Sequence, residues 1–263
     1  MTGTASVPSV EVVVNSSREP ATWPAAFHGV ESMFLLRPPD IARVSRDLMP
    51  AVAFGRTAGL RHVVLLSVHG AGLVPVLPHA AAERWLRRSG LSWTFVRPSY
   101  FDQNLAGVLA PDIREHDEIV LPAGDSRTAF VDAHDVAAVA AAALVQPSAH
   151  AGRVWTPTGP ALTYSEVAGL LTAELGRPVR YRQVGSLAFL RHARGALGLP
   201  TSMAAITTVL HLSARVGLAA FETGDVQSVT GRPPGTFAAF AHRERAVWLR
   251  DSPPWPAGGR VTT

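Results

Sequence analysis

Short apolar runs alternate with segments of helical period along most of the chain. The run at 62–68 is nearly continuous, which is typical of a parallel strand covered on both faces. Strands that alternate with helices predict an α/β fold with a parallel sheet and right-handed crossovers. The strands expected in the first half are Val10–Val14, Glu31–Arg37, His62–Val68 and Trp93–Val96, and Glu31–Arg37 is expected to be buried like 62–68.

Helix signals fill the intervals between these runs. Asp40 is placed to cap a helix whose apolar residues Ile41, Val44, Leu48 and Val52 recur at helical spacing, with Gly59 as its stop. The segment 163–166, Thr-Tyr-Ser-Glu, reads as a capping box. A short helical stretch is expected to close at Gly29. Further helices are expected at 79–89, 133–145, 163–176, 186–197, 202–216 and 236–248, and further strands at 127–131, 154–156 and 179–181.

The order of elements predicts two structured parts and a tail. Residues 1–158 carry the strand–helix alternation and form the expected nucleotide-binding domain. Residues 159–250 are mostly helical and form a smaller cap for substrate, and residues 251–263 are rich in Pro and Gly and read as a flexible tail.

Composition narrows the chemistry. The 263 residues include no cysteine, and all 24 basic residues are arginine. Disulfides, thiol catalysis and Schiff-base lysines are therefore excluded. The arginines are scattered along the chain and the net charge is +4, so no nucleic-acid partner is expected. No signal-peptide pattern or membrane-spanning apolar run occurs, and the cytoplasm is the expected location.

Several short motifs occur in an order and spacing that resemble the NmrA-like, atypical short-chain dehydrogenase/reductase family, including its quinone-reductase-like bacterial members. The resemblance covers roughly residues 25–248. It is carried by Phe34–Pro39, Ala58–Ser67, His79–Glu83, Leu86–Gly90, Trp93–Pro98, Phe101–Leu105, 130–137, Thr158–Pro160, Thr163–Glu166 and Gly231–Pro234.

The resemblance implies a Rossmann-like parallel sheet, a bound NADPH or NADH and a small-molecule substrate. Family members begin with a strand and a glycine-rich turn that holds the cofactor pyrophosphate. In this sequence Met1–Ala5 is followed directly by Val10–Val14, which corresponds to the third strand of the family. We therefore expect an incomplete cofactor site with weak dinucleotide binding, and an exposed flank of the sheet that leaves the monomer marginally stable or is covered in a homodimer.

The resemblance and the strand ends together assign candidate site residues. Ligands of open α/β sheets bind at the carboxyl ends of the strands, and we expect the pocket between the ends of strands 62–67 and 93–97 and the helices beyond residue 185. The expected catalytic residues are Ser67, His79 and Tyr100. The expected cofactor contacts are Leu36, Pro38, Ser67, His79, Pro98, Tyr100 and Phe101, and Phe101 and Asn104 are expected to line the substrate pocket.

Structural roles compete with these assignments. Ser67 could satisfy local backbone, His79 could be an exposed first-turn residue, and Glu83 could serve as an ion-pair partner of Arg87 on the exposed side of a helix. Arg97 could bind an anionic group or pair with Asp132 or Asp135. His116, Asp132, His134 and Asp135 fit no compact metal-ligand spacing, so no metal is expected.

Three functions are consistent with the sequence. The leading one is an NAD(P)H-dependent oxidoreductase that acts on a small organic substrate. The second is a cofactor-independent isomerase or cyclase that uses the same substrate pocket. The third is a non-catalytic protein that senses a dinucleotide or another ligand, and the fold by itself does not choose among them.

Overall fold

The computed structural model describes residues 16–38, 41 and 43–251. The predicted strand Val10–Val14, the predicted cap Asp40 and nearly all of the predicted tail lie outside these residues. The chain divides into two compact units, which are described separately. Unit 1 holds the described residues up to Phe95 together with Ala143–Arg153, and unit 2 holds Val96–Ala142 and the described residues from Val154 onward. The domain boundaries expected from the sequence stay a prediction.

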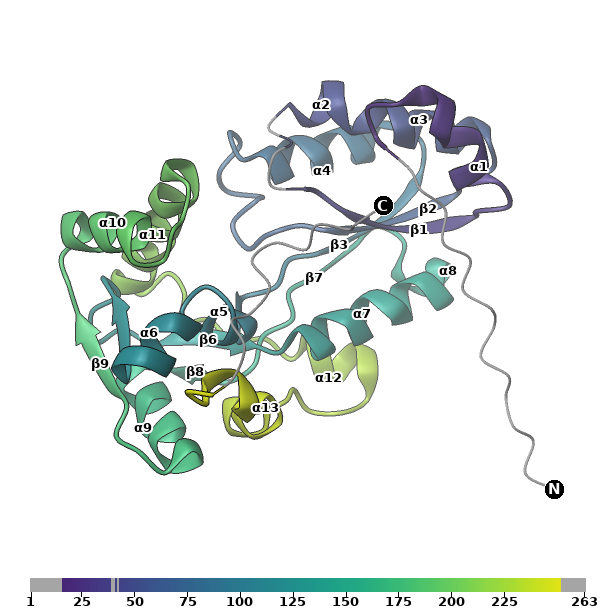
Figure 1. Ribbon diagram of the computed structural model, residues 1–263. Coiled ribbons are helices and arrows are strands. Elements are labelled where there is room, and N and C mark those ends of the chain that lie inside the picture. The colour runs from purple at the N-terminus through teal and green to yellow at the C-terminus, as the bar shows by residue number, and fades with distance from the viewer. Residues whose placement is uncertain (1–15, 39–40, 42, 252–263) are drawn as a thin grey trace. The chain divides into compact units, whose positions relative to one another are not determined.

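Unit 1 is built around a parallel sheet with strand order β1-β2-β3-β7 (Figure 1). Helices α2, α3 and α4 lie on one side of its strands and α8 on the other, which confirms the predicted α/β class. The elements that begin in this unit are η1 (Pro20–Thr22), α1 (Trp23–Phe27), β1 (Ser32–Leu36), α2 (Val44–Asp47), α3 (Met49–Thr57), β2 (His62–Leu66), α4 (Pro78–Arg88), β3 (Ser92–Val96), α8 (Pro147–His150) and β7 (Arg153–Trp155).

The two first strands of this sheet differ in burial. β1 and β2 pair in parallel from Ser32 opposite His62 to Leu36 opposite Leu66. β2 is buried as its apolar run predicts, whereas the expectation that 31–37 is a buried strand is wrong, because Phe34 is 42% and Leu36 57% exposed. β1 ends the strand order among the described residues, so it has a neighbour on one side only. The exposed flank expected from the sequence stays a prediction, because the predicted strand Val10–Val14 lies outside the described residues.

The helix expected between Asp40 and Gly59 is two helices, α2 and α3. The break falls at Leu48, and Pro50 follows in the first turn of α3, where a missing backbone N–H is tolerated. The apolar spacing still predicted the buried side, since Ile41, Val44, Leu48 and Val52 are all buried. Gly59, with φ of +113°, follows the end of α3 as predicted.

A buried hydrogen-bond chain crosses from β2 to β3. Thr94 Oγ1 donates to the His150 carbonyl at 2.7 Å, so this oxygen accepts from His62 Nε2 at 3.2 Å. His62 Nδ1 then lacks a hydrogen and accepts from Ser92 Oγ at 2.9 Å. Burial lowers the pKa of His62, as this neutral tautomer requires. The side chains of His62, Ser92 and Thr94 are thus hydrogen-bonded to one another and carry no charge.

Unit 2 contains two small sheets among helices, with strand orders β4-β6-β8 and β5-β9. β4 and β5 each have a parallel partner, and β8 pairs with β6 in antiparallel fashion. Its elements are β4 (Tyr100–Phe101), α5 (Gln103–Ala106), α6 (Ala110–His116), β5 (Glu118–Leu121), β6 (Thr128–Val131), α7 (Ala133–Val145), β8 (Ala161–Leu162), α9 (Tyr164–Leu175), β9 (Arg180–Gln183), α10 (Ser186–Gly195), α11 (Thr201–Arg215), α12 (Asp225–Thr230), α13 (Phe237–Glu244) and η2 (Arg245–Trp248).

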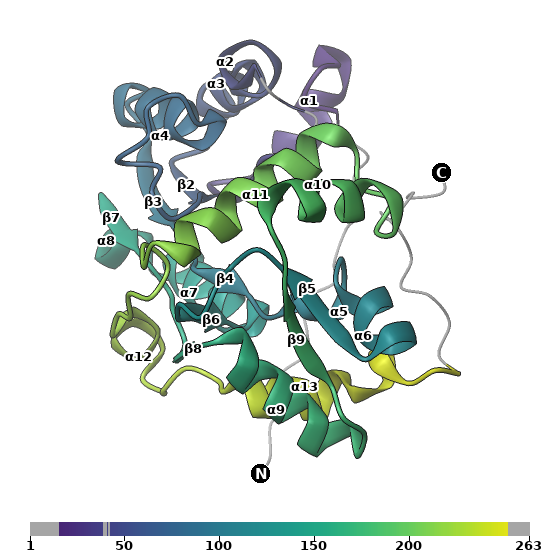
Figure 2. The same cartoon turned by 90° about the vertical axis from the view of Figure 1, so that its left-hand side faces the viewer.

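The helices of unit 2 enclose an aromatic core. Figure 2 shows β9 beside β5 and leading into the helix pair α10 and α11. The predicted capping box is present, since Thr163 Oγ1 accepts from the Glu166 N–H and the Glu166 carboxylate accepts from the Thr163 N–H. The core gathers large side chains from distant segments of the unit: Phe130, Tyr164, Phe189, Phe237, Phe240 and Trp248.

Two glycines of unit 2 predict opposite effects of the same substitution. A Cβ on Gly159 would lie 2.6 Å from the Phe130 carbonyl oxygen, whereas a Cβ on Gly169 in α9 would meet no atom within 4 Å. Gly159→Ala should therefore destabilise the protein by about 1–3 kcal/mol. Gly169→Ala should stabilise it by roughly 0.5–1 kcal/mol through helix propensity. Urea unfolding of both variants measures the two signs, and equal effects would contradict this packing.

Candidate functional site

Ser67 and Glu83 form a buried hydrogen bond in unit 1. The Ser67 hydroxyl at the end of β2 donates to Glu83 Oε1 of α4 at 2.6 Å, and both side chains are buried. Glu83 also pairs with Arg87 at 3.1 Å. The predicted pairing of Glu83 with Arg87 is confirmed, but its placement on an exposed side is wrong because the carboxylate lies inside. The contact fixes α4 against β2. Because the Ser67 hydroxyl hydrogen is already donated to Glu83, the Ser67 oxygen can only accept a further hydrogen bond.

Arg87 covers the carboxylate on its outer side. Its guanidinium lies over two rings of β3, with its carbon 5.3 Å from the Trp93 ring centroid and 4.8 Å from that of Phe95. The two rings are stacked with centroids 4.1 Å apart. Arg87 therefore joins an ion pair to a cation–π contact, and a lysine would not reproduce both.

His79 lies in the first turn of α4 and contacts an arginine from the end of β1. Arg37 Nε donates to His79 Nε2 at 3.4 Å, and Arg37 Nη1 donates to the carbonyls of Pro38 and Ile41. Burial, followed by the charge of Arg37, lowers the pKa of His79 to about 4. His79 is therefore neutral near pH 7, with its proton on Nδ1. Leu36 is exposed at the end of β1, and Pro38 is half-buried.

The other predicted site residues lie in unit 2. Tyr100 and Phe101 form β4 and pair with Phe130 and Val131 of β6. Both are half-buried, as is Asn104 at the start of α5, whereas Pro98 is buried. Burial raises the pKa of Tyr100, against smaller effects of Tyr164 and Asn104, so its hydroxyl stays protonated. The catalytic, cofactor and substrate roles of these residues and of the residues in unit 1 stay predictions.

The sequence did not single out Tyr164, His211 or Thr128, which surround Tyr100. The ring centroids of Tyr100 and His211 lie 5.6 Å apart, those of Tyr164 and His211 5.9 Å apart, and those of Tyr100 and Tyr164 6.3 Å apart. His211 falls at helical spacing with the buried residues Ala204 and Thr208 of α11, which is the signal that could have placed it inside.

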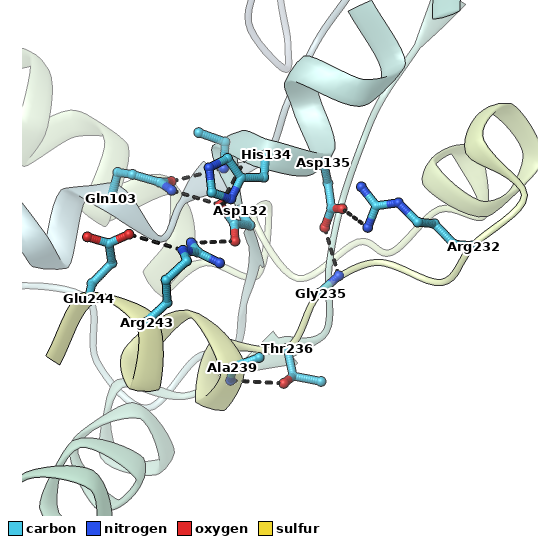
Figure 3. A network of polar contacts seen from close by, with 11 residues as sticks. Gln103, Asp132, His134, Asp135, Arg232, Gly235, Thr236, Ala239, Arg243 and Glu244 are labelled. Carbon is cyan, nitrogen blue, oxygen red and sulfur yellow. Dashed lines mark hydrogen bonds and ion pairs between the residues drawn. The ribbon is translucent and has the colours of Figure 1, made fainter. Parts of the chain in front are cut away.

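Two carboxylates at the start of α7 hold several segments of unit 2 (Figure 3). Asp132 accepts hydrogen bonds from Gln103 at 2.8 Å, from the His134 N–H at 3.0 Å and from Arg243 at 2.7 Å. Burial raises its pKa, but these donors outweigh that effect and the net pKa is lowered. Asp132 therefore stays ionised and links α5 and α13 to the end of β6.

Asp135, one turn further along, makes a second link. It accepts from the Gly235 N–H at 2.7 Å and pairs with Arg232 at 3.0 Å (Figure 3). The pairing of Arg97 with either carboxylate, which the sequence suggested, stays a prediction. Two further arginines bind them, Arg243 at Asp132 and Arg232 at Asp135. Both come from the carboxyl-terminal segment, about 100 residues away in the sequence.

Asp102 is a third carboxyl beside this network. It is buried, and its Oδ1 has no hydrogen-bond partner among the described residues. Burial, with the charges of Asp132 and Asp135, raises its pKa to about 8. Asp102 is therefore protonated near pH 7. Within the described ranges, no group of three or more His, Asp or Glu residues could hold a metal ion.

A hollow of about 390 Å³ is lined by residues of α2, α3 and α4 in unit 1. It contains none of the predicted site residues, so its size does not identify the site. Its lining is rich in arginine: Ser45, Ala53, Arg56, Ala81, Arg84, Trp85, Arg88 and Ser89.

The described residues do not provide a turn for a dinucleotide pyrophosphate. Gly70-Ala71-Gly72 follows β2, but the next helix begins only at Pro78. A Cβ on Gly70 would meet nothing within 4 Å, so this glycine serves its φ of +81° and makes no close approach. A phosphate turn needs glycines that lead directly into a helix N-terminus. This part of the chain therefore does not fit the phosphates of a dinucleotide.

The parallel sheet with polar groups at its strand ends defines an α/β protein of the nucleotide-binding type. The NmrA-like family matches residues 4–213, and the chain belongs to that family. It is 38% identical over 249 residues to the NAD(P)H azoreductase of Xenophilus azovorans, covering 91% of this chain and 84% of that protein.

Two further comparisons agree with this assignment. The chain is 35% identical over 244 residues to the (4-alkanoyl-5-oxo-2,5-dihydrofuran-3-yl)methyl phosphate reductase of Streptomyces griseus, covering 87% of this chain and 80% of that protein. The Escherichia coli NADPH-dependent quinone oxidoreductase, solved with NADPH, has a TM-score of 0.78 and 24% identity over 89% of this chain and 83% of its own. Every helix in the described ranges is too short or too polar to cross a membrane.

The raised pKa of Asp102 predicts how stability depends on pH. In the unfolded chain this carboxyl ionises near its ordinary pKa of 3.8, whereas the folded protein keeps it protonated up to about pH 8. Its contribution to the free energy of unfolding is therefore largest at low pH and is lost as pH rises from about 4 to 8.

Asp102→Asn removes this titration. The variant should become more stable relative to the parent protein as pH rises from 4 to 8, by more than about 1.4 kcal/mol, the free energy that corresponds to a tenfold change in proton affinity. Urea unfolding at several pH values measures the difference, with half-buried Asp47→Asn as the control, because the hydrogen bond from Arg46 lowers the pKa of Asp47 below this pH range. A difference independent of pH would show that Asp102 is ionised in the folded state.

Proposed function

We propose that the chain takes part in the NAD(P)H-dependent reduction of a small organic molecule. The observation that carries the proposal is the 38% identity to an NAD(P)H azoreductase over nearly the whole chain. The similarity to a second reductase supports it. A reduced nicotinamide supplies a hydride when it is bound.

The strand ends of unit 1 are proposed to face the nicotinamide. Leu36 offers exposed apolar surface and Pro38 a half-buried ring at the end of β1. His79 is neutral and keeps a hydrogen on Nδ1, so it can donate to a carbonyl without bringing a positive charge. Ser67 donates to Glu83 and is left with an accepting oxygen for the ligand.

The residues of unit 2 are proposed to bind the substrate. Tyr100 keeps its proton because burial raises its pKa, so it orients the substrate as a hydrogen-bond donor and does not act as a base near pH 7. Asn104 supplies an amide, and Phe101 an apolar wall from the same segment.

A cofactor-independent isomerase or cyclase is the second candidate. The observation that favours it is the absence of a glycine-rich phosphate turn among the described residues, while the polar groups around Tyr100 lie within one unit. A ligand-sensing protein would use the same residues. It differs from the reductase and from the isomerase or cyclase in that it binds its ligand without converting it.

The first test is the affinity for the cofactor. The described residues lack the phosphate turn and, with it, two or three charge-assisted hydrogen bonds at about 1.5–3 kcal/mol each. At 1.4 kcal/mol per decade this lowers the affinity by roughly two to six decades. Calorimetric titration of NADH and NADPH into the purified chain should therefore give a dissociation constant weaker than micromolar. Fusing a glycine-rich βαβ unit, of the kind that the family resemblance implies, in front should restore binding.

The same fusion tests the reaction. It should oxidise NADPH or NADH in the presence of an azo compound or a quinone, the substrate classes named for the relatives. A fusion whose turn glycines are replaced by alanine is the matched control and should be inactive. Reduction by neither form would contradict the proposal. Conversion without a dinucleotide would favour the isomerase or cyclase, and binding without conversion would favour the sensor.

A further inference from the structure

Three buried polar atoms around Tyr100 in unit 2 lack hydrogen-bond partners among the described residues. They are Thr128 Oγ1, Tyr164 Oη and His211 Nε2. The three side chains are buried, with exposed fractions of 1%, 0% and 1%. Buried polar groups in native proteins are nearly always paired, so unpaired ones call for an explanation such as a ligand or an ordered water.

The free nitrogen of His211 is an acceptor. Its Nδ1 lies 2.7 Å from the Thr207 carbonyl, to which only an N–H can donate. Nε2 therefore carries a lone pair in the neutral ring. Burial lowers the pKa of His211 to about 4, which keeps the ring in this state at neutral pH. A group that satisfies Nε2 must bring a hydrogen.

The three atoms belong to one cluster. His211 and Tyr164 lie with ring centroids 5.9 Å apart, and both rings meet Tyr100. Burial raises the pKa of Tyr164, and the hydroxyls of Tyr100 and Thr128 lie close enough to that of Tyr164 to act on its pKa, although neither reaches it with full hydrogen-bond geometry. Tyr164 and His211 therefore lie beside the proposed substrate residue Tyr100, and Thr128 lies near the Tyr164 hydroxyl.

Aromatic rings complete the surroundings. Phe130 lies 5.6 Å from Tyr164, and Phe189 lies 5.8 Å from His211, by ring centroids. Such walls bind a planar apolar body, while a few placed polar groups fix its orientation.

We propose that Thr128, Tyr164 and His211 form the recognition site for a hydroxyl or N–H group of a neutral aromatic or conjugated substrate. The ligand group donates to His211 Nε2 and accepts from the hydroxyls of Tyr164 and Thr128. An ionised ligand is disfavoured because the cluster is buried and its three members are neutral. This inference specifies the substrate class of the proposed reductase and rests on that function for its biological role.

Ligand binding without cofactor tests the inference separately from the reaction. The probe is 2-naphthol, whose hydroxyl both donates and accepts, and the matched ligand is 2-methoxynaphthalene, which cannot donate. Calorimetry should show that 2-naphthol binds more tightly, by about five- to 150-fold, the range expected when a buried acceptor is left unpaired. Equal affinities would overturn the donor–acceptor assignment, even if the protein reduces other substrates.

Conservative variants separate recognition from structure. Tyr164→Phe and Thr128→Val each remove an unpaired hydroxyl, so the unfolding midpoint of the ligand-free protein should stay unchanged or rise. The dissociation constant of 2-naphthol should increase by at least about fivefold in each. Tyr181→Phe is the control, because the Tyr181 hydroxyl already donates to the Leu121 carbonyl at 3.3 Å. It should lower the midpoint and leave 2-naphthol binding unchanged.

The opposite pattern would overturn the proposal. If Tyr164→Phe and Thr128→Val lower the unfolding midpoint and leave 2-naphthol affinity unchanged, the hydroxyls are held by ordered water and serve the fold.

Discussion

The ion pair between Asp132 and Arg243 is the interaction on which the second unit depends. A buried carboxylate is costly unless several donors meet it, and Asp132 receives donors from α5, from the start of α7 and from α13. Asp135 repeats the arrangement with Arg232 and the Gly235 N–H. These contacts fix α13, whose Phe237 packs on Phe130 in the aromatic core. The aromatic core beside Tyr100 is therefore held in place by charges at the start of α7.

The buried carboxylates of unit 2 find hydrogen-bond partners within the protein, so the buried polar atoms that lack partners need a separate explanation. Asp132 and Asp135 have their partners within the chain, whereas the nearby Tyr164, Thr128 and His211 each keep a buried polar atom without one among the described residues. Asp102 is also unpaired at Oδ1, but it can relieve the cost of burial by holding its proton. Neutral hydroxyls and a neutral imidazole have no such escape, so a bound group that donates and accepts is the physical solution.

Local signals explain what the sequence predicted. The continuous apolar run of β2, the helical period of α4 and the capping box of Thr163 and Glu166 are each contained within a few residues, and all three are present. The break at Leu48 also has a local signal in Pro50. Long-range pairing had none: β5 pairs with β9 and β6 with β8 across intervening segments, and nothing in the short runs specified these partners.

The candidate site also combines residues that local signals predicted with partners that they did not. Strand ends predicted Ser67, His79 and Tyr100 as candidates, but their partners come from elsewhere in the sequence. Glu83 was predicted from its spacing to Arg87, and its hydrogen bond to Ser67 could not be seen from helix periodicity. Tyr164 and His211 lie on α9 and α11, with a strand and a further helix between them, so their convergence on Tyr100 required the fold.

A crystal structure of the protein with 2-naphthol tests the central claim most directly, namely that unit 2 recognises a neutral donor–acceptor group. The account predicts the ligand oxygen within hydrogen-bond distance of His211 Nε2 and the Tyr164 hydroxyl, with the rings packed against Tyr100. Ordered waters on these atoms, with the ligand bound elsewhere or absent, would contradict it.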